Sequence, residues 1–142
     1  MSVRHLDHVN MTVKDFDETV AWYGRVFDFK LVEAGVMDGH RWGVIRSGDA
    51  MLCIYERPGY VYKDRFEFEG EKIHVMRHVG LRYSNRSEWE ERMAREGIEV
   101  DPGCIAENPH SKSWYIRDPT GHEIEVACWE DDVISFEGCA MS

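Results

Sequence analysis

The chain has 142 residues, in which 17 lysines and arginines face 27 aspartates and glutamates, so that its formal net charge is −10 at pH 7. This length predicts one domain, and 43% hydrophobic residues with 12% aromatics exclude an intrinsically disordered chain. The acidic balance argues against nucleic acid or an anionic membrane as the main partner.

The first half of the chain predicts one strand, one helix and three further strands. Residues 8–13 alternate in type and are typical of a short strand. Asp15 and Glu18 have the spacing of a helix cap, because a short polar side chain can accept from the free N–H groups of the first turn. One apolar face of the following helix contains Phe16, Val20, Tyr23 and Phe27. The strand-like runs that complete this half are 29–34, 42–46 and 50–55.

The second half repeats this order about 70 residues later. Residues 78–83 again predict a strand, Asn85 and Glu88 repeat the cap spacing, and Gly97 is placed to end the helix. The strand-like runs that follow are Ile98–Val100 continuing toward Ile105, Ser113–Arg117 and Glu123–Cys128. Each half therefore has the order β-α-β-β-β, and the agreement of strands, caps and histidines in register indicates a duplicated unit.

The segment between the halves, residues 57–72, is charged and contains glycine, proline and four aromatic residues. We interpret it as a connector with packed aromatics, and a flap over a site is the alternative. The whole chain is expected to form one domain with a first module at about 5–56, a linker at 57–74, a second module at about 75–129 and an acidic tail at 130–142.

The cysteines and the N-terminus indicate a reduced, cytoplasmic protein. Cys53, Cys104, Cys128 and Cys139 form no CxxC motif, which argues against a zinc knuckle or a dithiol redox site. The first residues lead directly into a patterned segment, without the apolar core of a signal peptide. No apolar run approaches the roughly 18 residues of a membrane-spanning helix.

Several of these features resemble the vicinal oxygen chelate superfamily, which includes glyoxalase I, fosfomycin resistance proteins, bleomycin resistance proteins, methylmalonyl-CoA epimerase and extradiol dioxygenases. The features are His8 on the first strand, Trp22-Tyr23 on the first helix, His78 at the start of the second half, and the stretch from Ser113 to Glu125 with its turn Asp118-Pro119-Thr120-Gly121. The resemblance covers about residues 5–129. It implies an α+β fold in which two tandem βαβββ modules form an open, cupped mixed sheet with helices outside and a divalent metal in the cup.

The resemblance also implies that His8, His78 and Glu125 bind the metal. Side-chain alternation is consistent with this, because it places Asn10 on the face of His8, Arg82 on the face of His78, and Glu123 on the face of Glu125. Two imidazoles and a carboxylate leave open positions on a first-row metal, through which a substrate can chelate by two neighbouring oxygens. Fe(II) is the favoured ion, with Mn(II), Ni(II) and Zn(II) as alternatives. A histidine at a strand start is otherwise a packed or surface residue.

The number of ligands favours some classes of this superfamily over others. The resemblance implies four metal ligands for glyoxalase I, one of them a carboxylate on the last strand of the first half. The corresponding residues here, 50–56, contain no carboxylate before the final Glu56. Bleomycin-binding members lack the metal ligands. Three ligands fit the dioxygenases and the fosfomycin-type transferases.

Tyr115, ten residues before Glu125, resembles the active-site tyrosine of extradiol dioxygenases. It could donate a hydrogen bond to a substrate oxygen, although fosfomycin-type members share it and a packed aromatic is the alternative. Those dioxygenases also carry an acid–base histidine, which residues 49–55 lack. His74 and His110 are the candidates for that role, with ordinary loop positions as the alternative. Asn10 and Arg82 are candidates for substrate binding, and an ion pair between Arg82 and Glu123 is the alternative for Arg82.

We therefore expect a divalent-metal enzyme with a small-molecule substrate, and a dioxygenase first. The alternatives are a glyoxalase-type lyase or isomerase, a fosfomycin-type thiol transferase, and a small-molecule (drug) binding protein without catalysis. A homodimer is expected, because two short modules leave sheet edges that commonly need covering.

Overall fold

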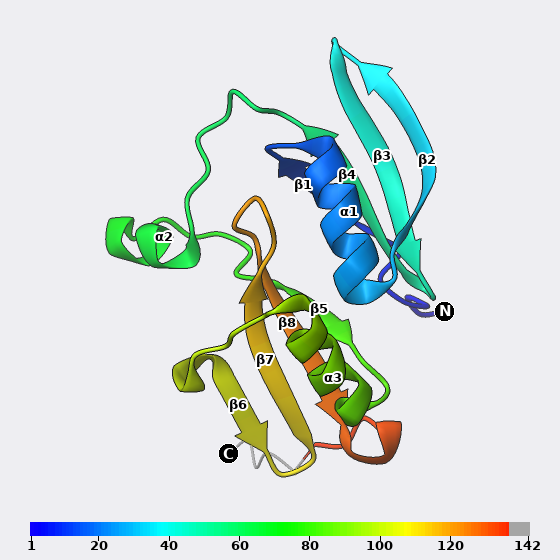
Figure 1. Ribbon diagram of the computed structural model, residues 1–142, viewed down its shortest axis with the longest axis vertical. Helices are drawn as coiled ribbons and strands as arrows, with labels where there is room; N and C mark the ends of the chain where they lie inside the picture. The colour runs from blue at the N-terminus through cyan, green and yellow to red at the C-terminus, as the bar shows by residue number, and fades with distance from the viewer. Residues whose placement is uncertain (137–142) are drawn as a thin grey trace. The chain divides into compact units, whose positions relative to one another are not determined.

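The computed structural model describes residues 1–136, which form two compact units (Figure 1). The first unit consists of Met1–Glu67 together with Asp118–His122, and the second consists of Phe68–Arg117 and the described residues from Glu123 onward. Cys139 and the end of the tail lie outside the described residues. Within residues 1–136, no helix combines the length and the apolar character needed to cross a membrane.

The first unit is an open, four-stranded mixed sheet with one long helix. Its elements are β1 (Val9–Val13), α1 (Phe16–Phe27), β2 (Lys30–Met37), β3 (His40–Ser47) and β4 (Ala50–Glu56). The strand order is β1-β4-β3-β2, with β1 parallel to β4 and the other neighbours antiparallel. The following segment contains α2 (Arg65–Glu71).

The second unit repeats this topology. Its elements are β5 (Val79–Arg82), α3 (Arg86–Glu96), β6 (Ile105–Asn108), β7 (Ser111–Arg117) and β8 (Glu123–Trp129), with short 3-10 turns at Pro102–Cys104 and Glu130–Asp132. The strand order is β5-β8-β7-β6, with β5 parallel to β8. The predicted α+β class and the two tandem βαβββ modules are confirmed.

Both long helices begin at the predicted caps. Asp15 Oδ1 accepts from the Glu18 N–H at 2.8 Å, and Asn85 Oδ1 accepts from the Glu88 N–H at 3.1 Å. Gly97 ends α3 with a φ of 64°, a left-handed conformation that glycine adopts without strain.

Each sheet buries one face beneath its helix and leaves the other face open (Figure 1). On β4 the residues buried beneath α1 are Leu52 and Ile54, and on β8 the buried residues are Ile124, Val126 and Cys128. Burial raises the pKa of the Cys128 thiol to about 11. The buried residues of α1 are Phe16, Thr19, Tyr23, Val26 and Phe27. Val20 of the predicted stripe is only half-buried.

Two parts of the sequence-based prediction differ from the structure. Ile98–Val100 is not a strand, because the chain turns through Pro102–Cys104 before β6 begins at Ile105. The linker contains the helix α2, which the sequence-based prediction did not include. Asp64 and Glu67 form a reciprocal capping box there, with contacts of 3.0 and 2.8 Å between each side chain and the other's backbone N–H.

The turn between β7 and β8 is a buried hydrogen-bonded structure that belongs to the first unit. Asp118 is 5% exposed, and its Oδ1 accepts from the backbone N–H groups of Thr120, Gly121 and His122 at 2.9–3.0 Å. Its Oδ2 accepts from the Tyr23 hydroxyl of α1 at 2.8 Å. Burial and the Asp118 carboxylate raise the pKa of Tyr23 well above its ordinary value, so that its hydroxyl remains a donor.

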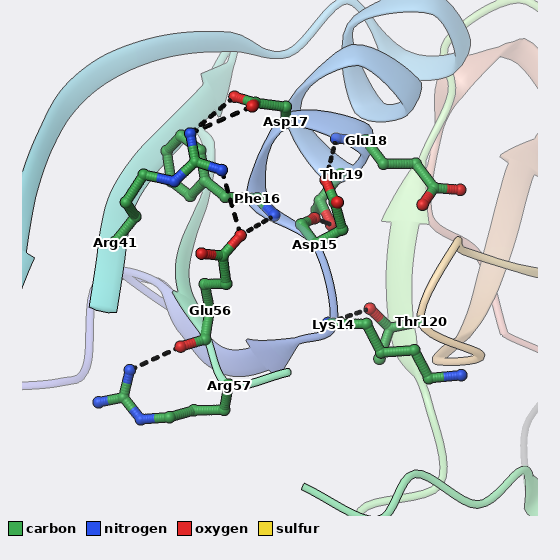
Figure 2. Close-up of polar contacts among 10 residues, drawn as sticks. All are labelled: Lys14, Asp15, Phe16, Asp17, Glu18, Thr19, Arg41, Glu56, Arg57 and Thr120. Atoms are coloured by element: carbon green, nitrogen blue, oxygen red, sulfur yellow. Dashed lines mark hydrogen bonds and ion pairs between the residues drawn. The ribbon is translucent and has the colours of Figure 1, made fainter. Parts of the chain in front are cut away.

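Two further hydrogen bonds fix the same turn to the first module. The Lys14 N–H donates to Thr120 Oγ1 at 3.1 Å (Figure 2), and His122 Nε2 lies 2.7 Å from the Thr12 carbonyl oxygen of β1. This turn, which is part of the stretch that carries the family resemblance, therefore has a structural role.

The buried pair leads to a prediction about stability. Tyr23→Phe should lower the free energy of unfolding by about 1–3 kcal/mol, because the buried Asp118 carboxylate loses a donor that water does not replace. Urea denaturation measures the change. Tyr60→Phe is the matched control, since Tyr60 is 59% exposed, and should change stability by less than about 0.5 kcal/mol. Equal effects of the two substitutions would contradict the role given to Asp118.

Candidate functional site

The open face of the second unit carries a row of polar side chains on its two central strands. Tyr115 of β7 lies directly opposite Glu125 of β8, and Arg117 lies opposite Glu123. Their side chains point away from the face buried beneath α3, because neighbouring residues of a strand point to opposite faces. Glu125 and Glu123 keep side-chain exposed fractions of 23% and 10%.

His78 immediately precedes β5 and contacts both carboxylates. Its Nε2 lies 2.8 Å from Glu125 Oε2, and its Nδ1 lies 3.4 Å from Glu123 Oε1. The ring of Tyr115 packs edge-on against the imidazole, with centroids 5.4 Å apart and planes at 75°. The parallel pairing of β5 with β8 produces this arrangement, since it sets Gly80 beside Glu125 and therefore brings the preceding residues of β5 to the same end of β8.

These distances fit a pair of metal ligands. Nitrogen and oxygen ligands at about 2.1 Å from one ion, at right angles to each other, are about 3 Å apart, close to the observed Nε2–Oε2 separation. A metal-binding histidine commonly donates its second ring N–H to a carboxylate, which is the position of Glu123. Glu123 is thus a candidate for orienting His78, a role that the sequence did not indicate although alternation placed it on the correct face.

His8 of the first unit has a matching environment. It immediately precedes β1 as His78 precedes β5, and its Nδ1 lies 2.7 Å from Asp7 Oδ2. In both histidines a carboxylate therefore faces Nδ1, which leaves Nε2 as the atom suited to bind an ion. No pattern in the sequence pointed to Asp7.

The first unit carries no carboxylate at the position equivalent to Glu125. Asn10 pairs with Cys53 as Gly80 pairs with Glu125, so Cys53 holds the equivalent place. Burial, together with Asp7 and Glu33, raises the pKa of the Cys53 thiol, which disfavours the thiolate that binds metals.

Glu56, the one carboxylate of β4, is engaged in other contacts. Its Oε2 accepts from the Phe16 N–H at 2.7 Å and lies 3.2 Å from Arg41 Nη2 (Figure 2). The same Arg41 also contacts Asp17 at 3.0 Å, so Glu56 stabilises the start of α1.

Each unit taken alone holds an incomplete ligand set. Across residues 1–136, no group of three or more His, Cys, Asp or Glu side chains is placed to hold a metal ion. His8 belongs to the first unit, whereas His78 and Glu125 belong to the second. The structure thus brings two of the three predicted ligands together.

The candidates for substrate binding have different surroundings. Asn10 is exposed on the open face of β1. The ion pair between Arg82 and Glu123, which was the alternative to a role of Arg82 in substrate binding, is wrong. Arg82 lies opposite Ala127, four residues along β8 from Glu123, and its Nε donates to Asp132 Oδ1 at 3.0 Å while its Nη2 donates to the Asp132 carbonyl.

The two acid–base candidates also differ. His74 is exposed in the segment between α2 and β5. His110 precedes β7, with its Nδ1 3.4 Å from Glu130 Oε2, and it lines a cavity of about 450 Å³ that also reaches Glu125.

Comparison with known proteins gives three kinds of match. The chain matches the model of the Glyoxalase/Bleomycin resistance protein/Dioxygenase superfamily over residues 5–126. It is 26% identical over 125 residues to the metallothiol transferase FosB of Shouchella clausii, covering 87% of this chain and 80% of that protein.

Two solved structures illustrate the similarity of fold. A glyoxylase/bleomycin resistance protein/dioxygenase domain from Frankia sp. matches with a TM-score of 0.73 and 22% identity, covering 92% of this chain and 95% of that one. The fosfomycin resistance protein FosX from Listeria monocytogenes, a variant complexed with Mn(II) and 1S,2S-dihydroxypropylphosphonic acid, matches with a TM-score of 0.68 and 18% identity, covering 90% and 94%.

Proposed function

Because the chain belongs to the Glyoxalase/Bleomycin resistance protein/Dioxygenase superfamily, we propose that it is a divalent-metal-dependent enzyme whose small substrate chelates the metal through neighbouring oxygens. The observation that carries this proposal is the 2.8 Å approach of His78 Nε2 to Glu125 Oε2 beside Tyr115. His8 supplies the third ligand. The two units act as one domain in this proposal, because the ligand set is divided between them.

Each side chain has a distinct part in this site. The ion supplies Lewis acidity that polarises a substrate oxygen. His78 and Glu125 hold the ion, and Glu123 and Asp7 orient the two imidazoles through Nδ1. The Tyr115 hydroxyl donates a hydrogen bond to a substrate oxygen as negative charge develops there.

For the reaction we propose nucleophilic addition of the fosfomycin-type class, in which a thiol sulfur attacks an epoxide carbon of the chelated substrate. The carbon–sulfur bond forms as the carbon–oxygen bond of the epoxide breaks, and the thiol proton ends on the released oxygen. The support is the match to a protein described as a metallothiol transferase. Mn(II) is the first ion to test, because the FosX structure contains it and two imidazoles with one carboxylate suit a first-row ion. The expected Fe(II) preference stays a prediction.

A dioxygenase is the second candidate, and the observation that favours it is the cavity shared by His110 and Glu125. Histidine is the side chain that most often serves as a general acid or base in catalysis. Asn10 is retained as a substrate contact in either case.

We also propose a homodimer. The supporting feature is β2, an eight-residue edge strand whose exposed apolar side chains are Leu31, Val32, Val36 and Met37. A long apolar edge of this kind is commonly covered by another chain.

The proposed ligand set predicts a graded effect on metal affinity. Glu123→Gln should weaken Mn(II) binding by about 10- to 100-fold, as is typical for a partner that orients a metal-bound histidine. Glu125→Gln should weaken it more, because a charged ligand is removed. Glu107→Gln is the control, since that carboxylate is 70% exposed and pairs with Lys112 on another part of the sheet. Calorimetric titration measures all three, and wild-type affinity in Glu125→Gln would contradict the proposal.

The reaction class has its own test. The Mn(II)-loaded protein is expected to consume a thiol in the presence of an epoxide that carries a neighbouring phosphonate oxygen. Oxygen uptake by the Fe(II)-loaded protein with catechols, without thiol consumption, would overturn the transferase assignment in favour of the dioxygenase.

A further inference from the structure

The cavity beside Glu125 is a consequence of strand register within the second unit. Ser113 of β7 lies opposite Ala127 of β8, so the row that follows Tyr115 and Glu125 has small side chains. The next row places Ser111 opposite Trp129. A row of small residues between two rows that contain large ones creates a hollow, which has a volume of about 450 Å³ and is lined by residues of the second unit alone.

The hollow has Glu125 at one end and Trp129 at the other. These residues are four positions apart on β8, which corresponds to about 13 Å along a strand. Ser113 is 3% exposed, so the floor between them is closed. Phe136 packs edge-on against Trp129, with centroids 5.2 Å apart, and thereby restrains the indole. The end away from Glu125 is therefore an aromatic wall.

The charges around the hollow are unevenly distributed. Among the lining residues that the structure describes, Glu125 is the one carboxylate, and neither lysine nor arginine occurs. Arg82, adjacent to Ala127 in the register, is paired with Asp132. The one imidazole among the described lining residues, His110, already faces the Glu130 carboxylate at 3.4 Å, so an anionic group at the Trp129 end would lack a separate balancing cation there. The Ser111 hydroxyl offers a hydrogen bond to an uncharged polar group.

We infer that this hollow binds a flat, uncharged aryl or heteroaryl part of the substrate, placed over Ala127 and Ser113 and against Trp129. The neighbouring oxygens of the same molecule lie at the other end of the hollow, beside Glu125. The position of those oxygens rests on the proposed function, whereas the ring site does not. A substrate with only a methyl-sized group would leave most of the hollow unfilled.

Hydroxamates provide a direct test, because they chelate metals through two neighbouring oxygens and can differ in a single substituent. Acetohydroxamate, benzohydroxamate and para-carboxybenzohydroxamate are titrated calorimetrically with the full chain, each with and without Mn(II). Benzohydroxamate should bind about 10-fold more tightly than acetohydroxamate, because its ring buries apolar area in the hollow. The para-carboxylate should remove most of this advantage.

Variants locate the ring. Ala127→Leu fills the hollow and Trp129→Leu removes its aromatic wall, and each should reduce the ring advantage to about 2-fold or less while the affinity for acetohydroxamate is retained. Ala94→Leu, on the exposed surface of α3, is the matched control and should retain the full advantage. Melting curves establish that each variant is folded.

The two proposals fail in different ways. Equal or undetectable binding of benzohydroxamate and acetohydroxamate under both metal conditions would overturn the ring site, as would a ring advantage that survives both Ala127→Leu and Trp129→Leu. If Mn(II) increases the affinity for neither hydroxamate, the proposed metal function is wrong. The difference in affinity between benzohydroxamate and acetohydroxamate still tests the ring site.

Discussion

The parallel pairing of the first and last strands in each module is the constraint on which the candidate site depends. Because β5 lies parallel to β8 in the register Gly80–Glu125, the residue that precedes β5 meets the start of β8. His78 consequently faces Glu123 and Glu125 at 3.4 and 2.8 Å. A parallel pair requires a long crossover, which the helix and the two intervening strands of each module provide.

The duplication preserves the backbone and the histidines but not the rest of the chemistry. Both histidines stand one residue before their strand, with a carboxylate near Nδ1. The equivalent positions on the last strands differ, with Cys53 in one module and Glu125 in the other. The proposed ligand set is therefore asymmetric, and three ligands of this kind would leave coordination positions for a chelating substrate.

The sequence predicted features that depend on local rules and on alternation. The caps at Asp15 and Asn85 and the shared face of Glu123 and Glu125 are local properties, and they are confirmed. The partner of Arg82 was missed because Asp132 lies in a 3-10 turn after β8, where strand alternation gives no guidance. Trp129 was missed as a cavity wall because the predicted strand ended one residue too early. The proposal that His8, His78 and Glu125 bind one ion came from the family resemblance, because residue spacing alone does not place one module beside the other.

The central claim is that two histidines and one carboxylate hold a single ion. Pulsed electron paramagnetic resonance of the Mn(II)-loaded protein, with 15N-labelled histidine, counts the imidazole nitrogens bound to the ion. We predict two coupled nitrogens, of which one disappears in His8→Gln and the other in His78→Gln. Coupling to one nitrogen or to none in the unaltered chain would contradict it.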